Sequence, residues 1–236
     1  MTEELFREDA YLKRCEAVIT AVDERGIQLD RTIFYPTGGV QPGDTGRLVL
    51  SDGSEIPIAN TLKDRDDGAL LHIPQEGAPL PTTGQYVTAE IDWERRHRLM
   101  RMHTTLHILC SLVDGAVTGG SVGVDRSRLD FDIPEAPDKA DLETRINQII
   151  AEGHGIEIGS ITDEQLQANP DLVRTMSVSP PTGAGQVRTV RVAGVDYQPC
   201  GGTHVRSTGE IGPIRIGKIE KKGRLNRRIN IHLVDE

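Results

Sequence analysis

The chain has 236 residues, of which 36% are hydrophobic and 27% charged, and its formal net charge is -9. This composition is typical of a soluble globular protein. No apolar run approaches the roughly 20 residues that a helix needs to cross a bilayer, and the charged N-terminal stretch lacks the apolar core of a secretory signal. The three cysteines include no close pair, which argues against a disulfide framework. We therefore expect a cytoplasmic protein with no membrane partner.

The negative charge is concentrated in the first part of the chain. Residues 1–92 hold 8 Lys and Arg against 17 Asp and Glu, whereas residues 93–236 hold 19 of each. Local patches rather than net charge decide phosphate binding, so a basic group in the second part is either an RNA-binding surface or a solvated face. The first such group is Arg95, Arg96, Arg98 and Arg101, and the second is Arg215, Lys218, Lys221, Lys222, Arg224, Arg227 and Arg228.

Residues 13–92 contain short runs rich in β-branched and apolar residues, separated by turn residues such as those at 23–26 and 51–54. Runs at this spacing predict a small barrel or sandwich, and we assign residues 1–92 to a β-barrel domain. The predicted strands are Lys13–Val22, Ile27–Tyr35, Gly46–Leu50, Glu55–Leu62, Ala69–Ile73 and Gln85–Ile91.

The pattern changes at Trp93, which begins a stretch without Pro or Gly until Gly115. Its apolar residues recur at helical spacing, at Leu99, Met102, Leu106, Leu109 and Val113. We assign residues 93–236 to an α+β domain in which helices pack on an antiparallel sheet. Beyond the first helix the predicted elements are the strand Ser121–Ile133, the helix Lys139–Glu152 capped by Asp138, the strand Ile156–Ser160, the helix Thr162–Val173, the loop Ser179–Gln186, and strands Val187–Ala193, Ile214–Glu220 and Arg228–Val234.

Two short motifs hold residues that bind metal ions. His103 and His107 are four apart on the predicted helix, which places both imidazoles on one face, one turn apart. Cys200 and His204 bracket two glycines, which would allow a tight turn to bring them together. The 92 residues between the two motifs exclude a local zinc finger. Nitrogen and sulfur ligands also suit copper and iron, but tetrahedral coordination without redox chemistry favours zinc.

A zinc site of this composition has two interpretations. Four protein ligands close a structural site, whereas a catalytic site usually keeps one position for water. If all four residues ligate, either one is displaced by water or the metal positions a substrate that another water attacks. Cys110, one turn beyond His107, is the one alternative ligand that the sequence offers. The other histidines, including His72, have no partner motif and are expected to be surface or core residues.

A second motif is the glycine- and proline-rich segment TIFYPTGGVQPGDTG at residues 32–46. It predicts a strand that enters a shaped loop, and such loops let backbone N–H groups approach a ligand closely. A plain turn of the barrel is the simpler interpretation of this composition by itself.

Together these strings resemble the editing domain of alanyl-tRNA synthetase, and they resemble its free-standing relatives, the trans-editing alanyl-tRNA proteins, still more. The strings that carry the resemblance are HTTLH at 103–107, CGGTH at 200–204 and the segment 32–46, with further similarity at 118–132 and 223–236. The similarity runs from about residue 10 to the end. The editing domain of threonyl-tRNA synthetase is similar only in the histidine and cysteine motifs.

The resemblance implies a hydrolase that removes serine or glycine wrongly attached to alanine tRNA, with zinc held by His103, His107, Cys200 and His204. It also implies that the glycine-rich loop of the first domain completes the site, with Thr32 and Gln41 near the amino-acid pocket. One residue departs from the family pattern: Val40 stands where the family usually has a third glycine before Gln41. Valine is confined to negative φ, so a different loop shape is expected.

Two other classes of function fit the same residues. A zinc-containing RNA-binding module without hydrolysis would keep the basic groups and the metal but need no pocket. A metal-dependent esterase acting on a small molecule would act without RNA. The resemblance favours the editing hydrolase, with tRNA as its partner and Zn²⁺ as its cofactor.

Overall fold

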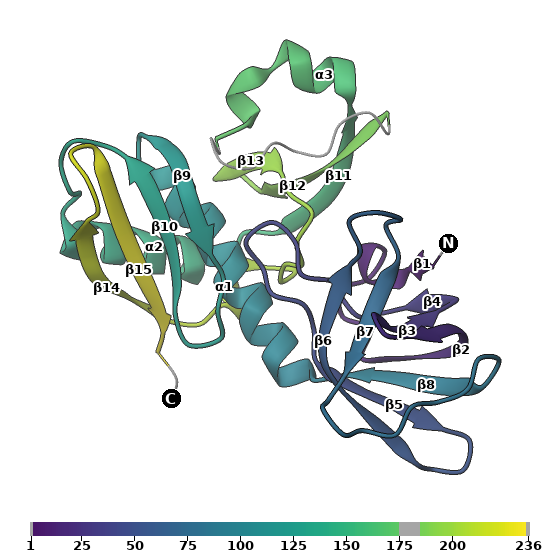
Figure 1. The fold of residues 1–236 in the computed structure, drawn as a ribbon. Coiled ribbons are helices and arrows are strands. Elements are labelled where there is room, and N and C mark those ends of the chain that lie inside the picture. The colour runs from purple at the N-terminus through teal and green to yellow at the C-terminus, as the bar shows by residue number, and fades with distance from the viewer. Residues whose placement is uncertain (1, 175–184, 235–236) are drawn as a thin grey trace. The chain divides into compact units, whose positions relative to one another are not determined.

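The computed structural model describes residues 2–174 and 185–234 (Figure 1). The chain divides into two compact units, Met1–Arg98 and Leu99–Glu236. The first unit is built on strands and the second combines strands with helices, which confirms the predicted α+β class. Most of the predicted loop Ser179–Gln186 lies outside the described residues.

The first unit contains a closed antiparallel barrel, as the sequence predicted, with strand order β2-β3-β7-β6-β5-β8. Alternate side chains point inward, as on β6, where Ile56 and Ile58 are buried beside exposed neighbours. The inward residues form one apolar core that includes Phe34 and Leu48. The strands are β2 (Arg14–Asp23), β3 (Gly26–Leu29), β5 (Gly46–Leu50), β6 (Glu55–Lys63), β7 (Leu70–Pro74) and β8 (Tyr86–Ile91).

The single strand predicted over residues 27–35 is wrong. The structure ends β3 at Leu29 and starts a short strand, β4 (Arg31–Thr32), which pairs in parallel with β1 (Glu3–Glu4). The interruption lies at Asp30, whose carboxylate accepts hydrogen bonds from the backbone N–H groups of Val18 (2.7 Å) and Arg31 (2.9 Å). An aspartate that bonds to nearby backbone in this way competes with a regular strand ladder.

The glycine-rich segment is fixed to the first unit by a buried ion pair. Arg96 and Asp44 are both fully buried, and the Arg96 Nε lies 3.0 Å from each carboxylate oxygen of Asp44. The guanidinium also donates to the carbonyl oxygens of Ala10 (2.8 Å) and Ile33 (2.7 Å), and Asp44 accepts from the N–H of Tyr35 (2.6 Å). Buried charges are tolerated when they are paired and hydrogen-bonded in this way. This pair holds both ends of the segment 33–44.

Val40 is accommodated without backbone strain. Gly38 and Gln41 exchange two backbone hydrogen bonds, of 3.1 and 3.0 Å, so Gly39 and Val40 form a two-residue turn. Only Gly39 takes a positive φ, +59°, and no described residue other than glycine does so. Val40 therefore occupies a position of the turn that does not require a glycine, because the positive φ falls on Gly39.

The second unit contains two antiparallel sheets. The larger has the order β14-β15-β10-β9 and the smaller β11-β12-β13. The helix α2 (Lys139–Glu152) contacts β14 and is capped by Asp138, as predicted, with its side chain accepting from the N–H of Asp141. The remaining strands are β9 (Ala116–Ser121), β10 (Ser127–Asp132), β11 (Ile156–Thr162), β12 (Gln186–Val192), β13 (Asp196–Pro199), β14 (Ile214–Lys221) and β15 (Asn226–Leu233).

Three predictions in this unit need correction. The predicted strand Ser121–Ile133 is not one strand, because β9 ends at Ser121 and β10 begins only at Ser127. The predicted helix Thr162–Val173 is a short helix, α3 (Asp163–Ala168), capped by Thr162, followed by a 3₁₀ turn that begins at Pro170. The strand β13 was missed because it is four residues long and ends in a proline.

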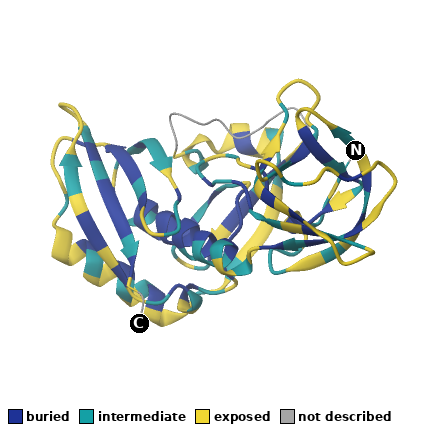
Figure 2. Ribbon diagram, turned by 60° about the horizontal axis from the view of Figure 1, so that its bottom comes forward, coloured by how far each residue is buried: buried dark blue, intermediate teal, exposed yellow. Residues whose placement is uncertain are grey.

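The helix α1 (Trp93–Leu112) matches the prediction of a helix that begins at Trp93. The predicted apolar stripe is buried, but Met102 to Cys110 are buried on every side, which Figure 2 shows as a dark blue helix. Because this part of the helix is buried, its polar side chains must form hydrogen bonds with other groups of the protein. No helix among the described residues is long and apolar enough to cross a membrane.

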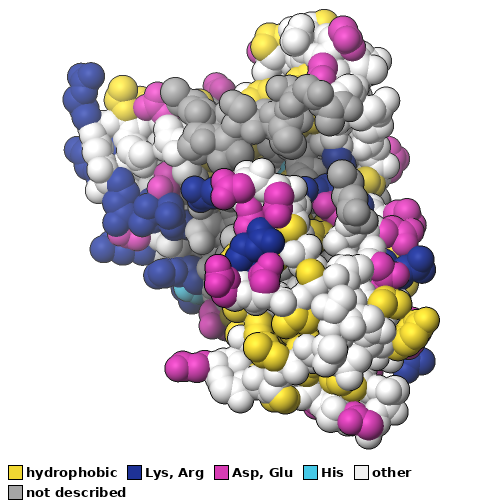
Figure 3. Space-filling model, turned by 45° about the vertical axis from the view of Figure 1, so that its right-hand side comes forward, with side chains coloured by type: hydrophobic (Ala, Val, Ile, Leu, Met, Phe, Trp, Pro, Cys, Tyr) yellow, Lys and Arg dark blue, Asp and Glu magenta, His cyan; other side chains and the backbone are white. Residues whose placement is uncertain are grey.

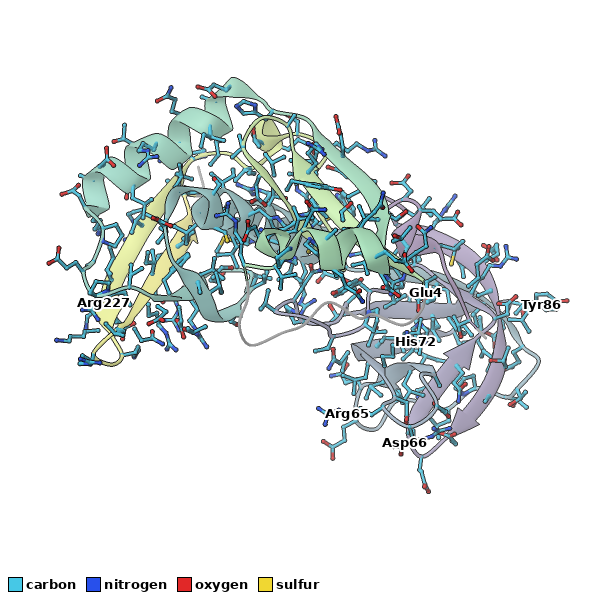
Figure 4. All side chains as sticks on the ribbon, turned by 90° about the horizontal axis from the view of Figure 1, so that it is seen from above. Glu4, Arg65, Asp66, His72, Tyr86 and Arg227 are labelled. Atoms are coloured by element: carbon cyan, nitrogen blue, oxygen red, sulfur yellow. The ribbon has the colours of Figure 1, made fainter. Side chains whose placement is uncertain are left out.

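His72, which the sequence left without a partner, lies inside the first unit (Figure 4) and is fully buried. Its Nδ1–H donates to the carbonyl oxygen of Ile27 (3.0 Å), so its Nε2 is an acceptor and takes the hydroxyl hydrogen of Thr32 (2.7 Å). The Thr32 oxygen in turn accepts from the N–H of Phe34 (3.1 Å). Burial lowers the pKa of His72 from 6.5 to about 4.

This burial predicts a specific pH dependence of stability. Below pH 6.5 the unfolded chain protonates His72, whereas the folded barrel keeps it neutral until pH about 4. The stabilisation from a neutral His72 is therefore complete above pH 6.5 and is lost as the pH falls from 6.5 to 4, by up to about 3 kcal/mol. Urea unfolding at several pH values should show a shallower fall in the free energy of unfolding for His72→Gln than for the unmodified chain. A His232→Gln control should keep the original slope, and equal slopes for all three chains would contradict the assignment.

Candidate metal centre

Four side chains of residue types that commonly bind metals converge in the second unit. His103 and His107 lie on α1, and Cys200 and His204 lie in the turn that follows β13. One ligand atom from each residue falls within 4.8 Å of all the others. The two motifs that the sequence singled out therefore meet in space. A group of three nitrogens and one sulfur is a donor set that suits a tetrahedral ion.

The local structure explains how each element presents its residues. On α1 the spacing of four places the two imidazoles on one face, with ring centroids 5.6 Å apart. On β13 alternate residues share a side, so Asp196 and Gln198 are buried on the same side of the strand and Cys200 follows in the same alternation.

Hydrogen bonds fix the orientation of two of the imidazoles. The Nδ1 of His107 lies 2.9 Å from a carboxylate oxygen of Asp196, and the Nδ1 of His204 lies 3.1 Å from the hydroxyl of Thr104. The Nε2 of His204 is 3.3 Å from the sulfur of Cys200, and the Nε2 of His103 is 3.6 Å from it. The Nδ1 atoms of His107 and His204 are therefore used outside the group, which leaves Nε2 of each ring as its ligand atom.

The electrostatics of the group favour a thiolate. Burial opposes ionisation of Cys200, but the charge of His103, the charge of His204 and hydrogen bonds from His103 and His107 together lower its pKa well below 9.0. Burial also opposes protonation of His107, but hydrogen bonds to Asp196 and Cys200 raise its pKa to about 10. Burial lowers the pKa of His204 to about 3. A metal binds the thiolate and neutral imidazoles, so its binding would release the proton that His107 holds.

The turn between Cys200 and His204 brings the two residues together, as the sequence predicted, with Sγ 3.3 Å from Nε2, but it needs no left-handed backbone at its glycines. Neither Gly201 nor Gly202 is among the described glycines with positive φ, and a Cβ atom at Gly201 would meet no atom within 4 Å. The turn is held instead by the N–H of Gly202, which donates to the sulfur of Cys200 (3.4 Å). Gly201 leaves open space beside Cys200.

The four residues of the group are not equally buried. The three histidines are buried, and Cys200 is only partly buried next to the exposed Gly201. Cys200 is therefore the least buried residue of the group. Cys110, the alternative ligand, is buried and is not a member of the group; burial raises the pKa of its thiol to about 11.

Thr32 and Gln41 both lie in the first unit and are almost completely buried. The Thr32 hydroxyl bridges Phe34 and His72, and one lone pair of its oxygen is not used by these two bonds. Gln41 closes the turn of the glycine-rich segment through its backbone. The partnership between Thr32 and His72 could not be found from the sequence, because forty residues separate them.

The two basic groups are less available than the sequence suggested. In the first group, Arg96 is buried against Asp44, and Arg95 donates to the carbonyl oxygen of Gly43 (2.8 Å). Arg101 donates to the carbonyl oxygen of Ile211 (2.6 Å). The interpretation of the first group as a solvated or phosphate-binding face is therefore wrong for the buried Arg96, whereas Arg95 and Arg101 are partly exposed.

In the second group, Arg227 and Arg228 also have structural roles. Arg227 is buried and donates to backbone carbonyl oxygens, among them that of Gly223 (3.1 Å). Arg228 forms two hydrogen bonds of 2.8 Å with Asp130. Figure 3 shows Lys and Arg side chains gathered on one side of the molecule, and Figure 4 labels Arg227 at the hairpin of β14 and β15. The exposed members of the second group are Arg215, Lys218, Lys221, Lys222 and Arg224, of which only Lys222 forms a salt bridge with a described residue, Glu220.

Two family models match this chain. The model described as the threonyl and alanyl tRNA synthetase second additional domain matches residues 187–230, which include Cys200 and His204. The model described as tRNA synthetases class II (A) matches residues 7–95, which include the glycine-rich segment. Part of the second unit is thus similar to an additional domain of threonyl and alanyl tRNA synthetases, and part of the first unit to class II synthetases, while His103 and His107 lie outside both matched ranges.

Individual relatives that match nearly the whole chain indicate a more specific family. Alanyl-tRNA editing protein AlaX-M of Methanosarcina mazei is 38% identical over 100% of this chain and 98% of its own length. The protein of the same name from Saccharolobus solfataricus is 33% identical, over 97% of this chain and 98% of its own length. The alanine–tRNA ligase of Pyrobaculum aerophilum is 32% identical over 93% of this chain but only 25% of its own length. The chain belongs to the alanyl-tRNA editing protein family.

Proposed function

We propose that this protein hydrolyses the ester of Ser-tRNA(Ala) and so removes serine that was wrongly attached to alanine tRNA. The observation that carries the proposal is the group of His103, His107, Cys200 and His204, whose donor atoms lie within 4.8 Å of one another in a member of this family. The names of the full-length relatives describe alanyl-tRNA editing. The proposed cofactor is Zn²⁺, which suits three nitrogens and one sulfur.

In this proposal His103, His107, Cys200 and His204 hold the ion, and other residues orient these ligands and bind the substrate. When bound, zinc would supply a Lewis acid for hydrolysis of the ester. The ester would approach on the side of Cys200, the least buried residue of the group, where a Cβ atom at Gly201 would meet no other atom within 4 Å. The hydrogen bonds between His107 and Asp196 and between His204 and Thr104 would keep both rings oriented during the reaction.

Deacylation of purified Ser-tRNA(Ala) tests the function directly. We expect release of serine by the zinc-loaded protein, loss of release after treatment with a chelator, and recovery when zinc is returned. A simple serine ester without RNA should be hydrolysed far more slowly, because the RNA contributes binding energy. Gly-tRNA(Ala), assayed in parallel, decides whether glycine is a second substrate.

The two alternative functions give different outcomes in the same assay. An RNA-binding module would bind the tRNA without releasing serine. A small-molecule esterase would hydrolyse the free ester as fast as the tRNA ester. Circular dichroism of the chelated protein is the control that its fold survives removal of metal.

The exposed basic residues of β14 and the β14–β15 turn are the proposed contact with tRNA phosphates. We expect a Lys221→Gln, Lys222→Gln, Arg224→Gln triple variant to bind tRNA more weakly. Its plot of log K against log salt concentration should be shallower by about 1 for each phosphate that the variant no longer neutralises, so by about 2 to 3.

The matched control removes three exposed charges elsewhere, with Lys63→Gln, Lys139→Gln and Arg145→Gln. Its salt dependence should equal that of the unmodified chain. An identical slope in both triple variants would mean that the basic residues of the β14–β15 hairpin are only a solvated face.

Thr32 is the proposed residue that distinguishes serine from alanine. A pocket that bonds the seryl hydroxyl discriminates strongly against a substrate without it, because the polar groups of the pocket would be left unpaired. The Thr32 hydroxyl hydrogen is used by His72, so the seryl hydroxyl would donate to the Thr32 oxygen. We expect Thr32→Val to lower the ratio of the Ser-tRNA(Ala) to the Ala-tRNA(Ala) hydrolysis rate by about 10- to 100-fold while zinc stays bound.

The control for this variant is Thr61→Val, a second buried threonine of the barrel, whose hydroxyl donates to the carbonyl oxygen of Asp44 (3.0 Å). It should lower stability without changing the ratio of the two rates. A ratio unchanged by Thr32→Val would move the search for the discriminating group to Gln41.

A further inference from the structure

Asp196 is a buried carboxylate that belongs to no motif of the sequence. Its side chain is 1% exposed, and its Oδ2 lies 2.9 Å from the Nδ1 of His107. Within residues 2–174 and 185–234 no Lys or Arg lies within salt-bridge distance of it. Its second oxygen, Oδ1, is buried and has no hydrogen-bond partner there. A buried carboxylate with so little compensation needs a positive charge nearby.

The carboxylate determines which nitrogen of His107 holds the hydrogen. An ionised carboxylate only accepts hydrogen bonds, so a nitrogen at 2.9 Å must donate to it. Gln198 donates from its Nε2 to the same oxygen of Asp196 (2.8 Å), which is consistent with an ionised carboxylate that accepts from both neighbours. When the His107 ring is neutral, as it must be to bind a metal, its hydrogen is therefore on Nδ1, and its Nε2 presents a lone pair to Cys200, His103 and His204.

The carboxylate also balances charge. The group as a metal site would bring together one thiolate, three neutral imidazoles and a divalent ion, with a net charge of one positive unit in a buried place. Asp196 is one hydrogen bond away and supplies the missing negative charge. A divalent ion, the Cys200 thiolate and the Asp196 carboxylate sum to zero, so no unpaired charge is buried.

We propose that Asp196 is a positioning residue of the metal centre, which fixes the Nε2 of His107 as a ligand and neutralises the loaded site. This inference rests on the metal centre of the proposed function and does not depend on which ester is hydrolysed. Partners of this kind orient ligands, and their loss lowers metal affinity by about 10- to 100-fold.

The test is competition for Zn²⁺ between the protein and a chromophoric chelator at constant pH. We expect Asp196→Asn, which keeps the shape and removes the charge, to weaken Zn²⁺ binding by about 10- to 100-fold. The matched control is Asp132→Asn, which removes an exposed carboxylate of the same unit and should leave the affinity unchanged. Equal affinities in the two variants would overturn the proposal.

A second measurement needs no variant and so holds even if Asp196→Asn fails to fold. Nitrogen-15 spectra of the histidine side chains in the zinc-loaded, unmodified protein should show His107 bound through Nε2 with its hydrogen on Nδ1. Binding through Nδ1 would overturn the proposal. Failure of the editing reaction is distinguishable, because a protein that binds Zn²⁺ through Asp196-supported His107 but releases no serine contradicts only the proposed reaction.

Discussion

Three imidazoles and one thiol share a small, mostly buried space in the second unit, and this constraint explains much of the surrounding structure. Lone pairs on donor atoms within 4.8 Å repel one another unless a positive charge lies among them. Protons supply part of that charge when His107 is protonated beside the Cys200 thiolate. A divalent ion supplies it without any further proton, which is why the same residues that are unfavourable as neighbours are suitable as ligands.

The fold meets this constraint by combining one long helix with one short strand. The helix α1 is buried around Met102 to Cys110, so its histidines cannot reach solvent and must be satisfied inside. The strand β13 supplies Asp196 and Gln198 on one side and leads directly to Cys200. Two of the candidate ligands thus lie on α1, and the other two lie in the turn that β13 leads into. In the first unit, a comparable role falls to Arg96 and Asp44, which fix the glycine-rich segment through buried hydrogen bonds.

Local patterns accounted for much that the sequence predicted. The barrel strands follow from alternation between turns, the helix α1 from its apolar spacing and α2 from its cap at Asp138. The grouping of His103, His107, Cys200 and His204 was expected from two short brackets and from resemblance to a family. The strands, the helices and each of the two brackets are determined by residues close together in the chain, whereas the pairing of the brackets was expected from the resemblance.

The features that were missed depend on contacts between distant residues. Asp30 interrupts a run that reads as one strand because its carboxylate bonds the N–H of Val18 on another strand. Arg96 looks like a surface cation but has Asp44 as a buried partner. Asp196 and His72 have no motif of their own and acquire a role only from what the fold places beside them. A search for an aspartate at alternate positions before Cys200 could have found the first of these two.

The central claim is that the four-residue group is a zinc site with three nitrogen ligands and one sulfur ligand. X-ray absorption at the zinc edge, on protein prepared without added metal or chelator, tests it most directly. The account predicts one zinc per chain, with nitrogen ligands at about 2.0–2.1 Å, one sulfur at about 2.3 Å, and no sulfur signal in Cys200→Ala. A shell of oxygen and nitrogen alone in the unmodified protein, or the absence of stoichiometric zinc, would contradict it.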